Sequence, residues 1–283
     1  MSVPDSIAIP SCARRTELEV PAGPLVALEG RPAGPVVSTV VLVPGFTGSK
    51  EDFLPLLDPL AAAGVRAVAL DLRGQHESPG LMEPGGYSIE AFGADVRAVL
   101  ALVADGRPLH LLGHSFGGHA VREALLSGDA PSDLRSLTLL CSGPAGVIGA
   151  ARARTELFVA ASRDLTLQQI HEMEPVDRHP DPAVQAFLLK RWLANDPASM
   201  RAIARSLLDE PDRTEELRAL LVAANLPCLV VTGVDEDVWP AELQRTTAER
   251  LGARFAAIPD AGHSPNTQQP EATAKVLLDF WLG

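Results

Sequence analysis

The chain has 283 residues, of which 46% are hydrophobic and 21% are charged, and its formal net charge at pH 7 is -12. This balance is typical of a globular protein with a buried core and excludes an intrinsically disordered chain. Because the net negative charge repels polyanions and no run of Lys and Arg interrupts it, we expect neither nucleic acid nor an anionic membrane surface as a partner. No uncharged stretch supplies the roughly 20 apolar residues of a membrane-spanning helix.

The N-terminal segment and the cysteines indicate the cellular compartment. Residues 1–15 contain two prolines and an aspartate where a secretory signal needs a basic start and an apolar stretch. Cys12, Cys141 and Cys228 are widely spaced and form no CxxC pair, so neither a disulfide framework nor a zinc site is indicated. The last two lie in apolar runs and are expected to be buried. We therefore expect a cytoplasmic protein.

In chain order, the predicted elements begin with an antiparallel hairpin over Arg14–Glu29, where short apolar alternation is broken by Pro and Gly. Continuous apolar or β-branched runs then predict buried strands, and apolar residues at helical spacing predict helices between them. The predicted strands are Val36–Val43, Ala67–Leu70, Leu109–Leu112, Leu134–Cys141, Pro227–Thr232 and Arg254–Ile258. The predicted helices are Asp52–Ala63, Ile89–Val103 and one that runs from Ser115 to about Leu126.

Strands that alternate with helices require right-handed crossovers, which predicts an α/β protein with a doubly wound, mostly parallel sheet. Residues 144–226 contain no run of strand type, and a structureless loop of that length is implausible. Apolar residues recur there at helical spacing, first at Leu157, Phe158 and Ala161 and later at Phe187, Leu188 and Trp192. The sequence therefore predicts a core formed by residues 1–143 and 227–283, with residues 144–226 as an inserted helical cap.

A candidate nucleophile lies in Gly113–Gly117, which fits the pattern G-x-S-x-G around Ser115. The motif is weak by itself, but here it follows the predicted strand Leu109–Leu112 directly and precedes a predicted helix, which is the setting of a nucleophile elbow. The two glycines allow strand and helix to approach closely while the strained turn exposes the hydroxyl. The amide of Phe116, at the helix N-terminus, then faces the place where an oxyanion would form.

A serine hydroxyl needs a base that takes its proton, and the chain contains seven histidines. His263 stands out because the loop Pro259–Pro265 follows a late predicted strand, at the carboxyl edge where the active sites of open sheets collect. The other histidines lie within the elbow, in predicted elements or in polar segments, where packing or surface roles are expected. His263 is therefore the candidate general base.

A third group should fix the tautomer of the imidazole, and three carboxylates are candidates. Asp235, Glu236 and Asp237 follow the predicted strand that ends near Gly233. The chain order of serine, acid and histidine is the one associated with a nucleophile elbow. The residues alone leave the choice among the three open.

Taken together, these motifs resemble those of the α/β-hydrolase superfamily over nearly the whole chain. Val41–Phe46 is similar to the family's strand and oxyanion loop, with Pro44 where His is usual. Asp71–Gln75 resembles the loop after the next strand, and Ala261–Pro265 resembles the histidine loop. The resemblance implies the α/β-hydrolase fold with a helical cap.

The resemblance also implies roles for particular residues. The backbone amide of Phe46 would join that of Phe116 in the oxyanion hole. The family pattern selects Glu236 as the acid, with Asp237 as the second choice, although family members more often have Asp at this position. Ser115 at the elbow argues against the branches with an acid nucleophile, which include epoxide hydrolases and dehalogenases.

We expect a serine hydrolase that cleaves an ester or thioester of a small, apolar substrate through an acyl-enzyme intermediate. This chemistry needs neither a metal nor an organic cofactor. A C-C bond hydrolase or perhydrolase with the same triad, or a ligand-binding homologue without useful turnover, remain alternatives, because fold and triad do not decide among them. Five side chains are predicted either to line an apolar pocket or to form the core of the cap: Phe46, Leu157, Phe158, Trp192 and Trp239.

Overall fold

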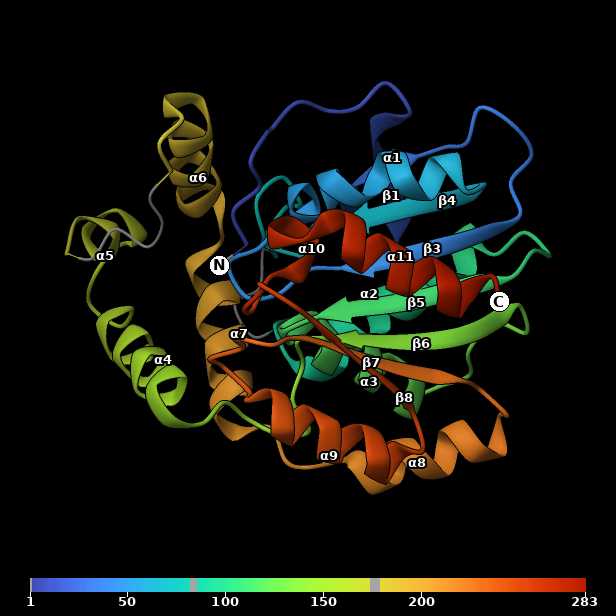
Figure 1. The fold of residues 1–283 in the computed structure, drawn as a ribbon. Helices are drawn as coiled ribbons and strands as arrows, with labels where there is room; N and C mark the ends of the chain where they lie inside the picture. The colour runs from blue at the N-terminus through green and yellow to red at the C-terminus, as the bar shows by residue number, and fades with distance from the viewer. Residues whose placement is uncertain (1, 82–85, 174–178) are drawn as a thin grey trace.

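An eight-stranded sheet forms the centre of the computed structural model, which describes residues 2–81, 86–173 and 179–283. The strands lie in the order β1-β2-β4-β3-β5-β6-β7-β8 (Figure 1). β2 is antiparallel to both β1 and β4, and every other neighbouring pair is parallel. The strands are β1 Ala13–Val20, β2 Gly23–Gly30, β3 Ser38–Val43, β4 Val65–Leu70, β5 Leu109–His114, β6 Leu134–Leu140, β7 Cys228–Gly233 and β8 Arg254–Ile258.

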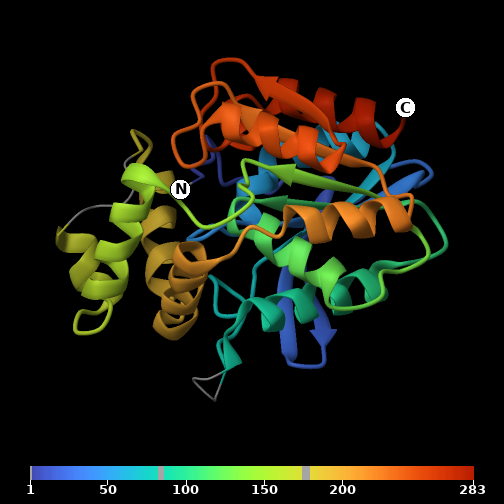
Figure 2. The ribbon, with the colours of Figure 1, turned by 90° about the horizontal axis from the view of Figure 1, so that it is seen from below.

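Helices cover both faces of the sheet, and each face has its own apolar core. On one face lie α1 (Leu54–Ala62) and α11 (Pro270–Trp281) (Figure 1). Their leucines are buried against the strands. Four helices lie on the other face (Figure 2), and their apolar side chains are buried together. These helices are α2 Ile89–Val103, α3 Phe116–Leu126, α8 Thr214–Ala223 and α9 Ala241–Leu251. The predicted doubly wound α/β fold is therefore confirmed.

Four helices lie together at one end of the sheet, beyond the carboxyl ends of the parallel strands (Figures 1 and 2). They are α4 Gly149–Ala161, α5 Leu167–Met173, α6 Pro182–Ala194 and α7 Pro197–Asp209. The side chains of Asp181 and Asp196 cap α6 and α7, each followed by a proline at the first helical position. We call α4–α7 the cap.

The predicted cap range 144–226 is larger than this group of helices. α8 lies within that range, yet it packs against α3 and α9 beside the sheet, with Leu217 and Leu221 buried there (Figure 1). Residues 174–178 of the predicted cap lie outside the described residues. The division of the chain into core and cap at residues 144 and 226 stays a prediction.

The predicted elements differ from the observed ones mainly at their ends. Residues 50–53 form a short 3-10 helix, η1 (Lys50–Phe53), before α1, because Ser49 and Asp52 close a capping box at this turn. β5 extends to His114, two residues beyond the predicted strand, because Gly113 and His114 still pair with β6. The strand therefore runs directly into the candidate nucleophile.

Polar contacts, a small apolar cluster and part of the main apolar core attach the cap, since Ile203 and Leu207 of α7 are buried in the same core as α2, α3, α8 and α9. Arg191 of α6 is fully buried and donates to Asp52 Oδ1 at 2.6 Å and to the Ser2 carbonyl at 3.0 Å. Arg122 of α3 donates to Glu210 Oε1, just after α7, at 2.8 Å. The apolar cluster consists of Leu167, Trp192 and Met200, with Phe46, Phe158 and Ile170 packed against it.

Among the described residues, none of the helices has both the length and the apolar character to cross a membrane.

Candidate active site

The turn around Ser115 has the strained geometry of a nucleophile elbow. Ser115 has φ 53° and ψ -121°, a combination that L residues rarely adopt. A Cβ on Gly113 would lie 2.3 Å from the Gly117 carbonyl oxygen, and a Cβ on Gly117 would lie 2.3 Å from that of Val43. Only glycine fits at either position, so the spacing of the motif follows from the close approach of β5, α3 and β3.

Ser115 and His263 form one continuous hydrogen-bonded chain with Glu236. The Ser115 Oγ lies 2.9 Å from His263 Nε2, and His263 Nδ1 lies 2.9 Å from both carboxylate oxygens of Glu236. The three residues come from the ends of β5, β7 and β8. With Nδ1-H donating to the carboxylate, Nε2 is free to accept the proton of the serine hydroxyl.

Burial and hydrogen bonding act against each other on Glu236. Burial raises the pKa of its carboxyl, since the side chain is fully inaccessible, but the hydrogen bond and charge of His263 lower it. The Val238 N-H also donates to Glu236 Oε1 at 2.7 Å. The net effect places the pKa of Glu236 below its usual range, so the carboxylate is ionised at neutral pH.

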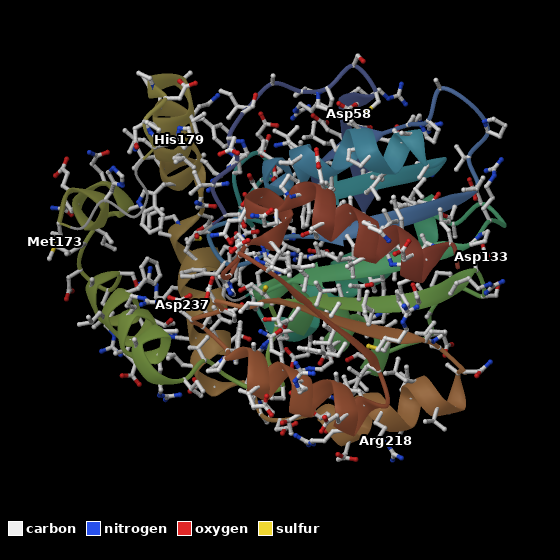
Figure 3. The ribbon with its side chains drawn as sticks, in the orientation of Figure 1. Asp58, Asp133, Met173, His179, Arg218 and Asp237 are labelled. Atoms are coloured by element: carbon white, nitrogen blue, oxygen red, sulfur yellow. The ribbon has the colours of Figure 1, made fainter. Side chains whose placement is uncertain are left out.

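The neighbouring carboxylates point elsewhere. The Asp237 side chain is 66% exposed and lies 3.6 Å from Arg154 of α4, and it is labelled near the cap in Figure 3. Asp235 is exposed, and its N-H donates to the Ala261 carbonyl at 2.9 Å. The structure thus brings Glu236 to His263 and does not bring Asp237 there. The alignment of the loop after β7 with the loop that carries His263 thus determines that Glu236 is the carboxylate that reaches the imidazole.

The two amides predicted for an oxyanion hole lie on either side of Ser115. Phe116 is the first residue of α3, where N-H groups have no partner within the helix. Gly45 is so close to Ser115 that a Cβ on this glycine would lie 2.8 Å from the Ser115 Cβ. Among the described residues, the N-H of the adjacent Phe46 has no protein acceptor.

Two further residues near His263 were missed as supports by the sequence analysis. The buried His114 donates from Nε2 to the His263 carbonyl oxygen at 2.7 Å, and burial lowers the pKa of His114 to about 3, so it is neutral. Trp239 is fully buried with its ring 6.1 Å from that of His263, and its Nε1-H donates to the Ala145 carbonyl at 3.1 Å. Nothing in the linear pattern distinguishes these residues from ordinary core residues.

Cys141 is buried as predicted, and burial raises the pKa of its thiol well above the usual value. Its Sγ, with a carboxylate oxygen of Glu236 and a ring nitrogen of His263, forms one set of metal-ligand atoms within 4.8 Å of one another. His263 and Glu236 are already paired in that set. The prediction that the protein needs no metal stays a prediction.

A second set of such ligand atoms comes from Glu51, Asp71 and His76. The Lys50 ammonium lies within it, 2.7 Å from Asp71 and 2.9 Å from Glu51, and supplies the positive charge that the carboxylates need.

The apolar side chains predicted for a pocket or for the core of the cap lie in different environments in the structure. Phe46 of the oxyanion loop meets Phe158 of α4 edge to face, with ring centroids 5.3 Å apart. Trp192 is buried inside the cap cluster. Leu157 is 70% exposed, so its predicted place was wrong: α4 is a surface helix and turns this residue outward. The site thus has an aromatic wall where the cap meets the oxyanion loop.

Beside the histidine loop lies an open cavity of about 460 Å³ with a polar lining. Its lining residues are Asp235, Asp237, Asp260, Ala261, Gly262, His263, Ser264 and Gln268.

Comparisons with known proteins agree with this architecture. Residues 40–276 match the model of the alpha/beta hydrolase family, and the chain belongs to this family. The chain is 29% identical over 247 residues to the dihydrolipoyllysine-residue acetyltransferase component of the acetoin cleaving system of Pseudomonas putida. That match covers 85% of this chain and 62% of the relative, so the chain spans less than two thirds of that protein's length.

Two further matches cover nearly the full length of both proteins. One is the 2-hydroxy-6-oxononadienedioate/2-hydroxy-6-oxononatrienedioate hydrolase of Paraburkholderia xenovorans, 26% identical over 266 residues, with 90% of each chain covered. The other is the crystal structure of a hydrolase from Pseudomonas aeruginosa, with a TM-score of 0.74, 24% identity and coverage of 95% of this chain and 98% of that one. Both matches agree with the assignment of the chain to the alpha/beta hydrolase family.

Proposed function

We propose that the protein is a cytoplasmic serine hydrolase that cleaves an ester or thioester of a small, apolar substrate. The observation that carries this proposal is the hydrogen-bonded chain from Ser115 Oγ through His263 to Glu236, with both distances at 2.9 Å. A strained serine with a base on one side and unpaired backbone N-H groups on the other is suited to acyl transfer.

In the proposed mechanism, Ser115 Oγ attacks the carbonyl carbon of the substrate while His263 Nε2 takes the hydroxyl proton. Glu236 stays ionised and stabilises the imidazolium through the hydrogen bond to Nδ1. The N-H groups of Phe46 and Phe116 donate to the oxyanion of the tetrahedral intermediate. His263 then gives the proton to the leaving oxygen or sulfur, which leaves an acyl group on Ser115.

Release of the acyl group repeats the same steps with water as the nucleophile. His263 Nε2 takes a proton from the water, the hydroxide adds to the acyl carbonyl, and collapse of the second tetrahedral intermediate returns the proton to Ser115 Oγ. An apolar acyl group is supported by the aromatic contact of Phe46 with Phe158, since this contact lies where the cap meets the oxyanion loop.

Intact-protein mass spectrometry after treatment with a fluorophosphonate tests this proposal. We expect one adduct that maps to Ser115 and is lost in Ser115→Ala and His263→Ala. Ser136→Ala is a matched control, because Ser136 is also buried and hydrogen-bonded to a histidine, at 2.8 Å, but lies outside the site. If folded wild-type protein forms no adduct on Ser115, the ligand-binding alternative replaces the hydrolase.

A further inference from the structure

Gln75, in the loop after β4, contacts the oxyanion loop although the mechanism above gives it no role. Its side chain is fully buried, and its Nε2 donates to the Gly45 carbonyl oxygen at 3.1 Å. The same oxygen accepts a second hydrogen bond, from the Gly48 N-H, at 3.1 Å. Two donors from different directions therefore fix this one carbonyl group.

The Gly45 carbonyl and the Phe46 N-H belong to the same peptide unit. No peptide bond of the described residues is cis, so these two groups point in opposite directions across one rigid plane. A donor that fixes the carbonyl thus also fixes the direction of the N-H. A hydrogen bond to the carbonyl further polarises the amide and makes its N-H a better donor.

The oxyanion loop has few other means to hold this peptide. Gly45 carries no side chain, because a Cβ there would lie 2.8 Å from the Ser115 Cβ. Thr47, on the other side of Phe46, has φ 63°, a conformation that L residues rarely adopt. The loop is strained and pressed against the nucleophile, so its orientation depends on contacts from outside.

The oxygen of the Gln75 side-chain amide makes no hydrogen bond to a described residue. Because Gln75 Oε1 is buried, the missing hydrogen bond costs free energy. The amide of Gln75 is therefore anchored through its Nε2 group, on the Gly45 carbonyl oxygen.

We propose that Gln75 is a positioning residue for the oxyanion hole. Its Nε2-H group holds the peptide between Gly45 and Phe46 in the orientation that directs the Phe46 N-H to the developing oxyanion. This inference rests on the proposed function, because it assigns a support to the same site.

The test compares Gln75→Met, which keeps the length of the side chain and removes the donor, with wild type. On a p-nitrophenyl ester we expect kcat to fall by about tenfold, less than the 10²- to 10³-fold loss on removal of a whole donor. KM should change little, because the ground-state carbonyl gains less from this N-H than the oxyanion does. The Ki of a trifluoromethyl ketone, whose adduct carries the oxyanion, should rise with the loss in kcat/KM.

Gln244→Met is the matched control. Gln244 is also fully buried, also has an unpaired Oε1, and donates to the Trp239 carbonyl at 2.8 Å and to Thr232 Oγ1 at 2.9 Å. We expect Gln244→Met to lower the melting temperature without a matching rise in Ki, whereas Gln75→Met should raise Ki with little change in melting temperature.

Gln75→Glu provides a second variant of nearly the same shape. Its protonated carboxyl can donate to the Gly45 carbonyl, but its ionised form cannot, so its kcat relative to wild type should fall as the pH rises. The same ratio for Gln75→Met should be flat with pH.

The inference is overturned if kcat and Ki are unchanged in Gln75→Met and if the kcat of Gln75→Glu relative to wild type does not change with pH. In that case wild type still forms its Ser115 adduct, so the proposed function stands. If wild type forms no adduct and hydrolyses no ester, the proposed function fails first and the inference fails with it.

Discussion

The carboxyl edge of the sheet and the cap above it are held in place by different kinds of contact. At the edge, Ser115, His263 and Glu236 are each fixed by a short hydrogen bond and by a strand that ends immediately before their loop. The cap is attached through buried side chains such as Arg191, through one small apolar cluster, and through α7, whose Ile203 and Leu207 are buried in one of the two sheet cores. The edge therefore fixes the reacting atoms, whereas α5 and α6, whose described residues supply no side chain to the two sheet cores, can change their packing at a smaller cost to the fold.

Because of this difference, we expect the sheet edge to carry out the reaction and the cap to select the substrate. Groups on strand ends hold the precise geometry that proton transfer and oxyanion binding need. The cap can vary the side chains of the aromatic wall, and hence the substrate, without disturbing those groups. Variants at the edge should thus abolish turnover in folded protein, and variants in the cap attachment should mainly lower stability.

The largest expected effect is on the nucleophile and the base. Ser115→Ala and His263→Ala should each lower kcat for ester hydrolysis by about 10³- to 10⁶-fold, and the double variant should be little worse than either one, because the two act as a unit. Steady-state kinetics and circular dichroism on the three variants check this. Losses that multiply in the double variant would contradict a shared proton-transfer step.

The next largest effect concerns the acid. Glu236→Gln should lower kcat on the order of 10⁴-fold, since the amide no longer stabilises the imidazolium. Asp237→Asn is the control: its side chain is exposed and pairs with Arg154, so kcat should stay close to that of wild type. Equal losses in both variants, measured by pre-steady-state kinetics, would show that the register of this loop does not select the acid.

In the cap attachment, Arg191→Met should lower the free energy of unfolding by about 3–5 kcal/mol, because it leaves Asp52 buried without its charged partner. Arg154→Met removes an exposed ion pair of 3.6 Å and should cost about 0–1 kcal/mol. Urea denaturation of both variants gives the comparison. A similar cost for the two would mean that the buried pair does not hold the cap to the core.

The smallest effect is the pH dependence of the same attachment. Burial raises the pKa of Asp52 from 3.8 to about 6, although the Arg191 guanidinium favours the charged form. The folded protein then binds this proton more tightly than the unfolded chain, so the Asp52 contribution to stability should grow as the pH falls from about 6 to about 4. The free energy of unfolding of wild type minus that of Asp52→Asn should rise over this range and stay flat above it.

Much of the fold was predictable because its strands are continuous apolar runs. A strand that is buried on both faces consists of a continuous run of apolar and β-branched residues, as in Val40–Val43. This run can be recognised in the sequence without knowledge of the neighbouring strands. The cap was predictable only as a helical region, because amphipathic helices such as α4 and α8 have the same spacing whether they cover a sheet or one another. The placement of α8 beside the sheet thus needed the tertiary structure.

The sequence by itself determined Ser115 and the Phe116 amide as candidates, because Gly113 and Gly117 indicate how closely strand and helix must approach. It determined His263 through the place of its loop after a late strand, whereas the Phe46 amide followed from the resemblance to the α/β-hydrolases. The spacing of residues left open which of Asp235, Glu236 and Asp237 meets His263. The family resemblance selected Glu236, and the tertiary structure brings the Glu236 carboxylate to His263 Nδ1. Only the tertiary structure decided that Gln75 meets Gly45 across 30 positions of the chain. Such contacts are set by the packing of neighbouring strand ends, which no linear spacing records.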